Sequence, residues 1–515
     1  MRIAKAAVSS TGRVHYNASV NRRKALGTLA GAALSAPFVS RGQARRPNIL
    51  FVMTDDQRWD AMSCAGNQIL RTPNMDRLAA GGVRFSQAFV TNSLCAPSRS
   101  CILTGLYTHA HGVITNGDGP DFRDQRGLLP QQKTFPGLLH DAGYFTAVVG
   151  KWHIRSMPTG FDHWCILPGQ GEYPDPEMIA NGVRVRFRDH CEDVVADQAL
   201  QALRYRPREK PFCLLLQFKA PHRPWIPAAR FVERYEHVTI PEPGNFNEDL
   251  SGRPAAVGKS DMQIADMPDF AQRGVAPTLP RSERKRLNFQ AFVKNYYRVL
   301  LGVDENLGRV LDYLDDERLA ENTLVIYTGD NGFFLGEHGM FDKRLMYEQS
   351  IRVPMLVRYP AGIKPGQVDA THLVLNNDVA PTVLDYAGVA APPETKGHSR
   401  SWKPLLEGRG GGWRDSWLYE YEEYPAVHCA GKCRGVRTSR WKYIHYWEKP
   451  EGHELFDLQS DPDEMRNLAG DPRYKDQLAQ MQKELDRLRT ETGDDRSRDG
   501  AAAKPCEIRM NPSGR

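Results

Sequence analysis

The chain has 515 residues, of which 41% are hydrophobic and 25% charged, as is typical of a globular protein with a large core. A formal net charge of +6 over this length is too slight a bias to indicate nucleic-acid binding. The nine cysteines show no paired Cys-x-x-Cys spacing, so neither a zinc framework nor a dense disulfide scaffold is indicated.

The first 44 residues have the character of an export signal. Two adjacent arginines at 22–23 precede a weakly apolar run at 25–39, and small residues at 42–44 suit a cleavage site. Such arginines are typical of a twin-arginine signal. Asn21 and Ala25 replace its usual neighbours, so a general secretory signal or a basic leader remains an alternative. The run is too short to span a bilayer, no other stretch is long and apolar enough, and we expect a periplasmic or secreted protein.

Four nearly continuous apolar runs predict buried strands, at 48–53, 145–149, 212–218 and 323–327. Strands without polar alternation are covered on both faces, which is typical of a mostly parallel sheet between layers of helices. Helical periodicity supplies such helices at 73–81, 134–142 and 287–314. The fold class is therefore predicted to be α/β.

Polar residues follow each of these runs, and they are Asp55 and Asp56, Lys151 and His153, Lys219 and His222, and Asp330 and Asn331. Because ligands gather beyond the carboxyl ends of parallel strands, we expect these side chains to meet at one edge of the sheet. Hard carboxylate and amide oxygens suit Ca²⁺ or Mg²⁺, although a helix cap or a solvated turn would also use them. The histidines and lysines would suit an anion, or would be ordinary loop residues.

A short helix is predicted to begin near Cys95, in the stretch Cys95-Ala96-Pro97-Ser98-Arg99. Pro97 suits a first helical turn and Gly105 suits a helix end. Cys95 would then lie at a helix N-terminus, which favours an anion, with Arg99 on the same face. The alternative is a structural buried cysteine. His109 and His111, nearby, are interpreted as structural.

Residues 240–286 are predicted to form a long loop that carries substrate determinants.

The C-terminal part differs in character from the rest. Beyond a glycine-rich joint at 408–412, short antiparallel strands are predicted at 417–421, 435–438 and 441–446, followed by a helix around 478–488. We expect a leader at 1–44, a catalytic domain at 45–406, a smaller α+β subdomain at 407–494 and a disordered tail at 495–515. Cys429 and Cys433 could close a small disulfide loop, with a metal pair as the alternative.

The Cys-x-Pro-Ser-Arg stretch, with Leu103-Thr104-Gly105 beyond it, resembles the maturation signature of the formylglycine-dependent sulfatases. Leu455-Phe456-Asp457-Leu458, Asp461-Pro462 and Asn467-Leu468 resemble a stretch common near sulfatase C-termini. The resemblance covers about residues 46–469 and implies an alkaline phosphatase-like fold with a second, smaller antiparallel sheet.

The resemblance also implies a mechanism. Cys95 would be oxidised by a maturation enzyme to formylglycine, whose hydrate is the nucleophile, and one Ca²⁺ would be held by Asp55, Asp56, Asp330, Asn331 and residue 95. Asp330 would help to activate the attacking hydroxyl. The charge on the sulfate would be stabilised by Arg99, Lys151, His222 and Lys343. His222 or Lys343 would protonate the leaving oxygen, and His153 would deprotonate the second hydroxyl so that sulfate leaves.

Residues 342–348 and 351–354 look most similar to sulfatases that act on glucosamine 6-sulfates of glycosaminoglycans. A sulfated carbohydrate is therefore the expected substrate, and the candidate subsite residues are Arg58, Trp225, His338 and Arg344. The alternatives are a phosphonate monoester or phosphodiester hydrolase, an arylsulfatase of broad specificity, and a catalytically silent carbohydrate-binding protein in which Cys95 is never matured.

Overall fold

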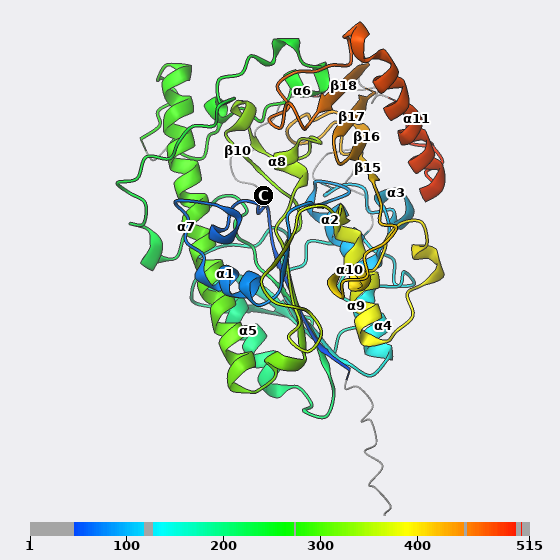
Figure 1. The fold of residues 1–515 in the computed structure, drawn as a ribbon. Coiled ribbons are helices and arrows are strands. Elements are labelled where there is room, and N and C mark those ends of the chain that lie inside the picture. The colour runs from blue at the N-terminus through cyan, green and yellow to red at the C-terminus, as the bar shows by residue number, and fades with distance from the viewer. Residues whose placement is uncertain (1–45, 118–126, 272–273, 448–450, 501–505, 507–515) are drawn as a thin grey trace, which may run out of the picture. The chain divides into compact units, whose positions relative to one another are not determined.

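A computed structural model describes residues 46–117, 127–271, 274–447, 451–500 and 506. The predicted leader and most of the predicted tail lie outside these residues. At the centre is a ten-stranded sheet with the order β13-β2-β12-β9-β1-β8-β4-β5-β6-β7 (Figure 1). In chain order its strands are β1 (Asn48–Thr54), β2 (Val83–Phe85), β4 (Phe145–Lys151), β5 (His163–Leu167), β6 (Glu177–Ala180), β7 (Val183–Arg186), β8 (Phe212–Gln217), β9 (Thr323–Gly329), β12 (Met355–Arg358) and β13 (Gln367–Asp369).

The predicted strands are the four neighbours β9, β1, β8 and β4, and they pair in parallel. β5 continues the parallel run on one side, while β12 on the other side pairs antiparallel with β9. The register sets Thr54 of β1 beside Gly329 of β9, so both strands end at the same level. The prediction of a mostly parallel central sheet is confirmed.

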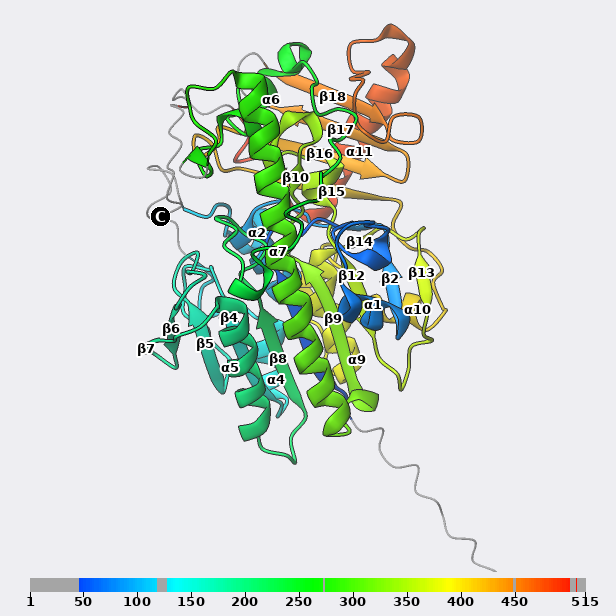
Figure 2. The ribbon, with the colours of Figure 1, turned by 90° about the vertical axis from the view of Figure 1, so that its left-hand side faces the viewer.

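Helices cover both faces of this sheet. Along β1, Ile49, Phe51 and Met53 pack into one hydrophobic cluster, whereas Leu50 and Val52 pack into another. The first cluster contains residues of α2 (Cys95–Thr104), α4 (Phe135–Asp141) and α9 (Val379–Ala387). The second contains residues of α1 (Pro73–Ala80), α5 (Cys191–Tyr205) and the long α7 (Arg281–Asp316), and Figure 2 shows α5 and α7 crossing that face. Both faces are buried, which explains the absence of polar alternation in the strands.

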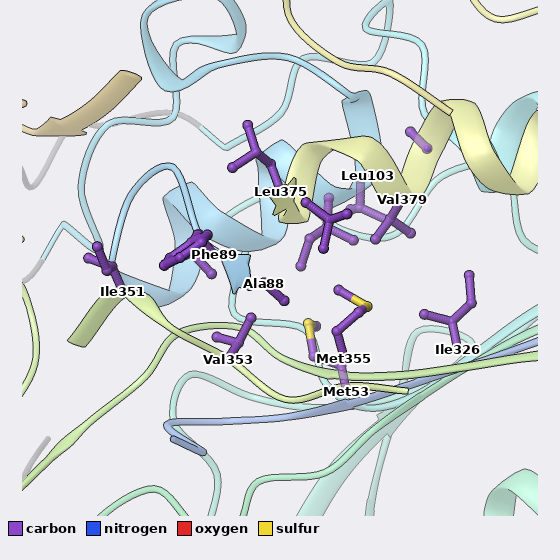
Figure 3. Packing of buried hydrophobic residues seen from close by; sticks show 14 of the residues in the cluster. Met53, Ala88, Phe89, Leu103, Ile326, Ile351, Val353, Met355, Leu375 and Val379 are labelled. Carbon is purple, nitrogen blue, oxygen red and sulfur yellow. The ribbon is translucent and has the colours of Figure 1, made fainter. Parts of the chain in front are cut away.

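Helix α2 is held against the sheet by close apolar packing. In Figure 3, Leu103 of α2 and Val379 of α9 lie on one side of this layer, and Met53, Ile326 and Met355 project from the strands toward them. Because interiors are close-packed, this contact limits movement of the helix relative to the strand ends.

A second sheet of four antiparallel strands follows, as predicted. Its strands are β15 (Ser416–Tyr421), β16 (Cys433–Thr438), β17 (Trp441–Tyr446) and β18 (Gly452–Asp457). Helix α11 (Lys475–Thr492), red in Figure 1, packs Met481, Leu485 and Leu488 against it. The domain boundary at residue 406 stays a prediction.

Short elements complete the described chain. The strands are β3 (Ala88–Phe89), β10 (Phe334–Leu335), β11 (Phe341–Asp342) and β14 (Val374–Leu375), and the helices are α3 (Thr108–His111), α6 (Ala255–Gly258), α8 (Glu348–Ile351) and α10 (Lys403–Leu406). The described residues of the predicted loop at 240–286 include α6, the 3₁₀ turns Leu250–Gly252 and Ile264–Asp266, and the first residues of α7. Among the described residues, no helix combines the length and the apolar character needed to cross a membrane.

The disulfide prediction was wrong in its partner. Cys429 pairs with Cys506, 77 residues away, and not with Cys433. Cys433 is the first residue of β16, where it lies opposite Tyr421 and Tyr446 and is buried within the sheet. Incorporation into the strand therefore directs Cys433 into the core, while Cys429, in the loop before the strand, meets Cys506.

Candidate active site

The carboxylates predicted at the strand ends lie together. One oxygen each of Asp55, Asp56 and Asp330 falls within 4.8 Å of the others. The aligned ends of β1 and β9 produce this proximity, and the Asp56 amide donates to Asp330 Oδ1 at 3.1 Å. Asp56 has a left-handed backbone with φ of 70°, a conformation that Asp tolerates better than most residues. Asn331 Nδ2 donates to Asp56 Oδ1 at 2.7 Å.

This group has the properties of a hard-cation site. All four side chains are buried, and Asn331 Oδ1 has no hydrogen-bond partner among the described residues. Burial and then the neighbouring carboxylates raise the pKa of Asp56 to about 7, with Lys343 opposing them. Burial and Asp55 likewise raise the pKa of Asp330 to about 6. A dication bound to these oxygens would relieve both effects, and an oxygen-only donor set suits Ca²⁺ or Mg²⁺.

Cys95 is the first residue of α2 and is 0% exposed. Its Sγ lies 3.5 Å from Asp55 Oδ1, and the following amide, of Ala96, donates to Asn116 Oδ1 at 3.0 Å. Burial, followed by the Asp55 charge, raises the pKa of the Cys95 thiol well above its ordinary value. An unmodified Cys95 would therefore be a protonated and weak nucleophile.

Arg99 lies one turn after Cys95 and connects the strand ends. Its Nε donates to Asp330 Oδ2 at 2.9 Å, and another guanidinium nitrogen lies 3.7 Å from Asp55 Oδ2. The helix ends at Gly105, whose φ of 76° is the left-handed conformation predicted for a helix stop.

Two lysines complete the charge balance. Lys151, at the end of β4, contacts Asp55, and Lys343, after β11, contacts Asp56. Lys151 Nζ also donates to Gln170 Oε1 at 2.5 Å. The formal charges of the site balance, because its carboxylates are matched by an equal number of cationic side chains. The carboxylates are Asp55, Asp56 and Asp330, and the cations are Arg99, Lys151 and Lys343. A bound dication would make the site positive and therefore attractive to an anionic ester.

Two neutral imidazoles border this cluster. The pKa values of His153 and His222 are held well below the ordinary range, first by burial and then by the Lys151 charge. His222 Nδ1 lies 2.7 Å from the Arg223 carbonyl, so Nδ1 carries the hydrogen, and Nε2 lies 3.8 Å from Asp56 Oδ2. His153 Nδ1 is buried without a hydrogen-bond partner in the described part of the chain. His222 Nε2 is thus a proton acceptor beside the carboxylates, and His153 Nδ1 is a further polar atom there that could contact a ligand.

The candidate subsite residues are already engaged by protein groups. Arg58 contacts Asp60 and Glu337, and His338 contacts Glu248. Arg344 NH1 donates to Asp342 Oδ1 at 3.0 Å. These contacts fix the polar side chains in position, and direct binding of substrate by them stays a prediction.

Trp225 occupies a different environment. Its indole is 0% exposed and packs among Phe270, Phe292 and Phe333. This burial favours a supporting role for Trp225 over contact with a substrate.

Sequence reasoning placed Lys219 at the predicted sheet edge without giving it a role, and it missed His428. Lys219, fully buried, donates to the Gln170 carbonyl at 3.0 Å. His428 Nε2 lies 3.1 Å from Asp342 Oδ2, and His428 Nδ1 lies 2.9 Å from Asp261 Oδ1. Asp342 immediately precedes Lys343 in the sequence. His428 is in an irregular loop, and no periodicity could have indicated it.

His109 has a structural contact, in agreement with its interpretation from sequence. Its Nδ1 lies 2.6 Å from Glu420 Oε1 and its Nε2 lies 2.9 Å from the Thr492 carbonyl, which connects α3, β15 and α11. Burial alone would lower the pKa of His109, but the Glu420 carboxylate outweighs burial and the pKa is raised.

We expect His109→Gln to lower the free energy of unfolding by about 1–2 kcal/mol near pH 6, and by less near pH 9. A raised folded-state pKa stabilises fully below the unfolded-state pKa of about 6.5, and this gain is lost as pH rises through the folded-state value. Urea unfolding at the two pH values measures the difference, with His140→Gln, at a half-exposed site, as control. An equal loss at both pH values would contradict the ion pair.

Residues 47–389 match a protein family described as Sulfatase. Residues 336–491 match a second family model, described as N-sulphoglucosamine sulphohydrolase, C-terminal. The first match spans the sheet strands β1 to β13 and every residue predicted for the reaction centre.

The chain is 39% identical to an N-acetylglucosamine-6-O-sulfatase of Bacteroides thetaiotaomicron, over 86% of this chain and 87% of that protein. It is 28% identical to the N-acetylglucosamine-6-sulfatase of Homo sapiens, over 85% and 84% of the two chains. Among solved structures, a protein in complex with its substrate D-glucosamine-2-N,6-O-disulfate matches with a TM-score of 0.80 and 36% identity, covering 88% of this chain and 99% of that one.

Proposed function

Because the chain belongs to the sulfatase family, it is a sulfuric ester hydrolase, and we propose that it removes the 6-O-sulfate of glucosamine units in a sulfated carbohydrate. The observation that carries the reaction type is the buried cluster of carboxylates, lysines and imidazoles around Cys95. The glucosamine specificity is supported by the printed activities of relatives that match over most of the chain.

We further propose that Cys95 is matured to formylglycine and that Asp55, Asp56, Asp330 and Asn331 hold one Ca²⁺. The raised pKa values of Asp56 and Asp330 and the unpartnered Asn331 Oδ1 fit this assignment. When present, the ion supplies Lewis-acid charge stabilisation, and the oxidised residue 95 supplies the hydroxyl nucleophile that an unmodified thiol would replace poorly.

The chain's own side chains bind the ester and move protons. Lys151 and Lys343 reach the carboxylates from two sides and would hold sulfate oxygens by charge-assisted hydrogen bonds, while Arg99 fixes Asp55 and Asp330. His153 is a neutral imidazole whose Nδ1 has no hydrogen-bond partner among the described residues, and it is the candidate base. Lys343 Nζ is the candidate donor to the leaving oxygen, because the neutral His222 carries its hydrogen on Nδ1 and has none on Nε2.

The leader at 1–44, the twin-arginine-like pair included, supports export to the periplasm or the cell exterior. An exported enzyme would meet sulfated polysaccharide outside the cytoplasm. The proposed function and the proposed maturation imply two partners, which are a sulfated carbohydrate substrate and an enzyme that oxidises Cys95.

We expect the matured enzyme to release sulfate from N-acetylglucosamine 6-sulfate at least about tenfold faster, in kcat/KM, than from an aryl sulfate, since substrate contacts add to transition-state binding. Ion chromatography of released sulfate measures this, with a galactose 6-sulfate as matched sugar. Equal rates on all three would contradict the glucosamine specificity.

An aryl phosphodiester tests the alternative chemistry with the same preparation. Faster cleavage of the diester than of every sulfate ester would favour the phosphonate monoester or phosphodiester hydrolase. Protein made by its native host that keeps an unmodified Cys95 and turns over none of these substrates would favour the carbohydrate-binding protein.

A further inference from the structure

The β17–β18 hairpin of the second sheet brings two histidines and a glutamate together. His445 and His453 are directly opposite in the antiparallel register, and Glu451 immediately precedes β18. The imidazole centroids lie 4.7 Å apart with planes inclined by only 23°, and His445 Nε2 contacts Glu451 Oε1. One ligand atom from each of the three residues falls within 4.8 Å of the other two.

A neighbouring hydroxyl orients the second imidazole. The Tyr443 hydroxyl oxygen lies 2.9 Å from His453 Nδ1, which leaves Nε2 as the nitrogen available to a ligand. Such hydrogen bonds to the second ring nitrogen fix the tautomer and orientation of metal-binding histidines. Two imidazole nitrogens and one carboxylate oxygen are donors that suit Zn²⁺, Ni²⁺ or Cu²⁺ and differ from the oxygen-only set at the strand ends.

The cluster of His445, Glu451 and His453 lies on one face of the second sheet. The residues of that sheet that contact the large α/β part of the chain lie on the opposite face. Alternation along β17 places Tyr443 and His445 on one face and Lys442 on the opposite one. Tyr443 packs with α11, whereas Lys442 lies 3.0 Å from Glu348 of α8. Glu451 is 40% exposed and His445 21% exposed at the side chain, so an ion could reach them from solvent.

We propose that His445, Glu451 and His453 form a second metal site, which binds a transition-metal dication of the Zn²⁺ class and is separate from the carboxylate cluster. The ligands are His445 Nε2, His453 Nε2 and a Glu451 carboxylate oxygen, with water completing the coordination. The bound ion ties the end of β17 to the start of β18. Because His must be neutral to bind a metal, affinity falls as the pH is lowered through the histidine range.

The test is calorimetric titration of tag-free, mature protein with Zn²⁺, in buffer that contains excess Ca²⁺ so that the strand-end carboxylates do not contribute. We expect one Zn²⁺ per chain, and weakening by at least about tenfold in His453→Ala and in Glu451→Gln. The ring centroids of Trp447 and His445 lie 5.0 Å apart, so Cu²⁺ is expected to quench the fluorescence of Trp447 in the parent and not in His445→Ala. His140→Ala, with a half-exposed histidine on α4, is the matched control and is expected to bind as the parent does.

Zn²⁺ binding that is unchanged in both His453→Ala and Glu451→Gln would overturn the proposal, as would the absence of binding in the parent. Glu451 is at the exposed edge of the hairpin, so Glu451→Gln keeps the test valid if a histidine variant does not fold. Zinc anomalous scattering at these side chains in crystals of the parent would support the assignment independently. No step of this test depends on sulfatase activity.

Discussion

Replacing Cys95 with alanine is expected to lower kcat/KM for sulfate ester hydrolysis by about 10⁴-fold or more, the scale on which removal of a nucleophile acts. Cys95 begins α2 next to Asp55, and alanine at this position has no sulfur that a maturation enzyme could oxidise to a nucleophile. Initial rates on N-acetylglucosamine 6-sulfate measure the loss.

Cys101→Ala is the matched control, because Cys101 is also a buried cysteine of α2 and contacts Thr91 and His111 instead of the carboxylates. It is expected to retain activity within about threefold while losing some stability. Mass spectrometry of the peptide around residue 95 should show a loss of about 18 Da relative to cysteine in active protein. Full activity of Cys95→Ala, or an unmodified Cys95 in fully active enzyme, would contradict the proposed maturation.

Asp56→Asn is expected to reduce bound Ca²⁺ below one per chain and to lower kcat/KM by about 10³-fold. The substitution keeps the shape of the side chain but removes one negative charge from the site, where Asp56 contacts Lys343 and accepts from Asn331. Without that charge the side chain also loses its ion pair with Lys343, which would displace a predicted sulfate contact. Calorimetric Ca²⁺ titration and metal analysis after dialysis measure the effect.

Asp304→Asn is a suitable control for burial. Asp304 is a buried carboxylate that accepts from the Asn74 and Met75 amides and connects α7 to α1, outside the carboxylate cluster. We expect it to cost about 1–3 kcal/mol of stability and to leave Ca²⁺ binding unchanged. If Asp56→Asn bound Ca²⁺ as tightly as the parent, while Asp304→Asn lost it, the assignment of the metal site would be wrong.

The central strands were predictable from sequence because burial on both faces leaves a local trace. The apolar runs at 48–53 and 323–327 correspond to the neighbours β1 and β9, and the acidic residues that follow them lie together as expected. The helix that begins at Cys95 and ends at Gly105 was equally local, since proline in the first turn and glycine at the end act through their own backbone.

Contacts between distant segments were not predictable in this way. Cys429 pairs with Cys506 across 77 residues of sequence, and His428 meets Asp342 because an irregular loop lies against β11. Trp225 could be placed after a strand end, but its burial among Phe270 and Phe292 depends on the packing of α7 and the 240–286 segment. Such contacts depend on surfaces that no short pattern encodes.

The sequence by itself therefore determined the central parallel sheet, the identity of the polar residues at its edge and the position of Cys95 at the start of a helix. Only the tertiary structure decided the charge state and the pairing of those groups. Asp56 has a raised pKa and His153 a lowered one because the folded chain excludes water and brings Asp55 and Lys151 near them. Burial and Coulomb energy depend on the complete three-dimensional environment, which residue identity and spacing do not contain.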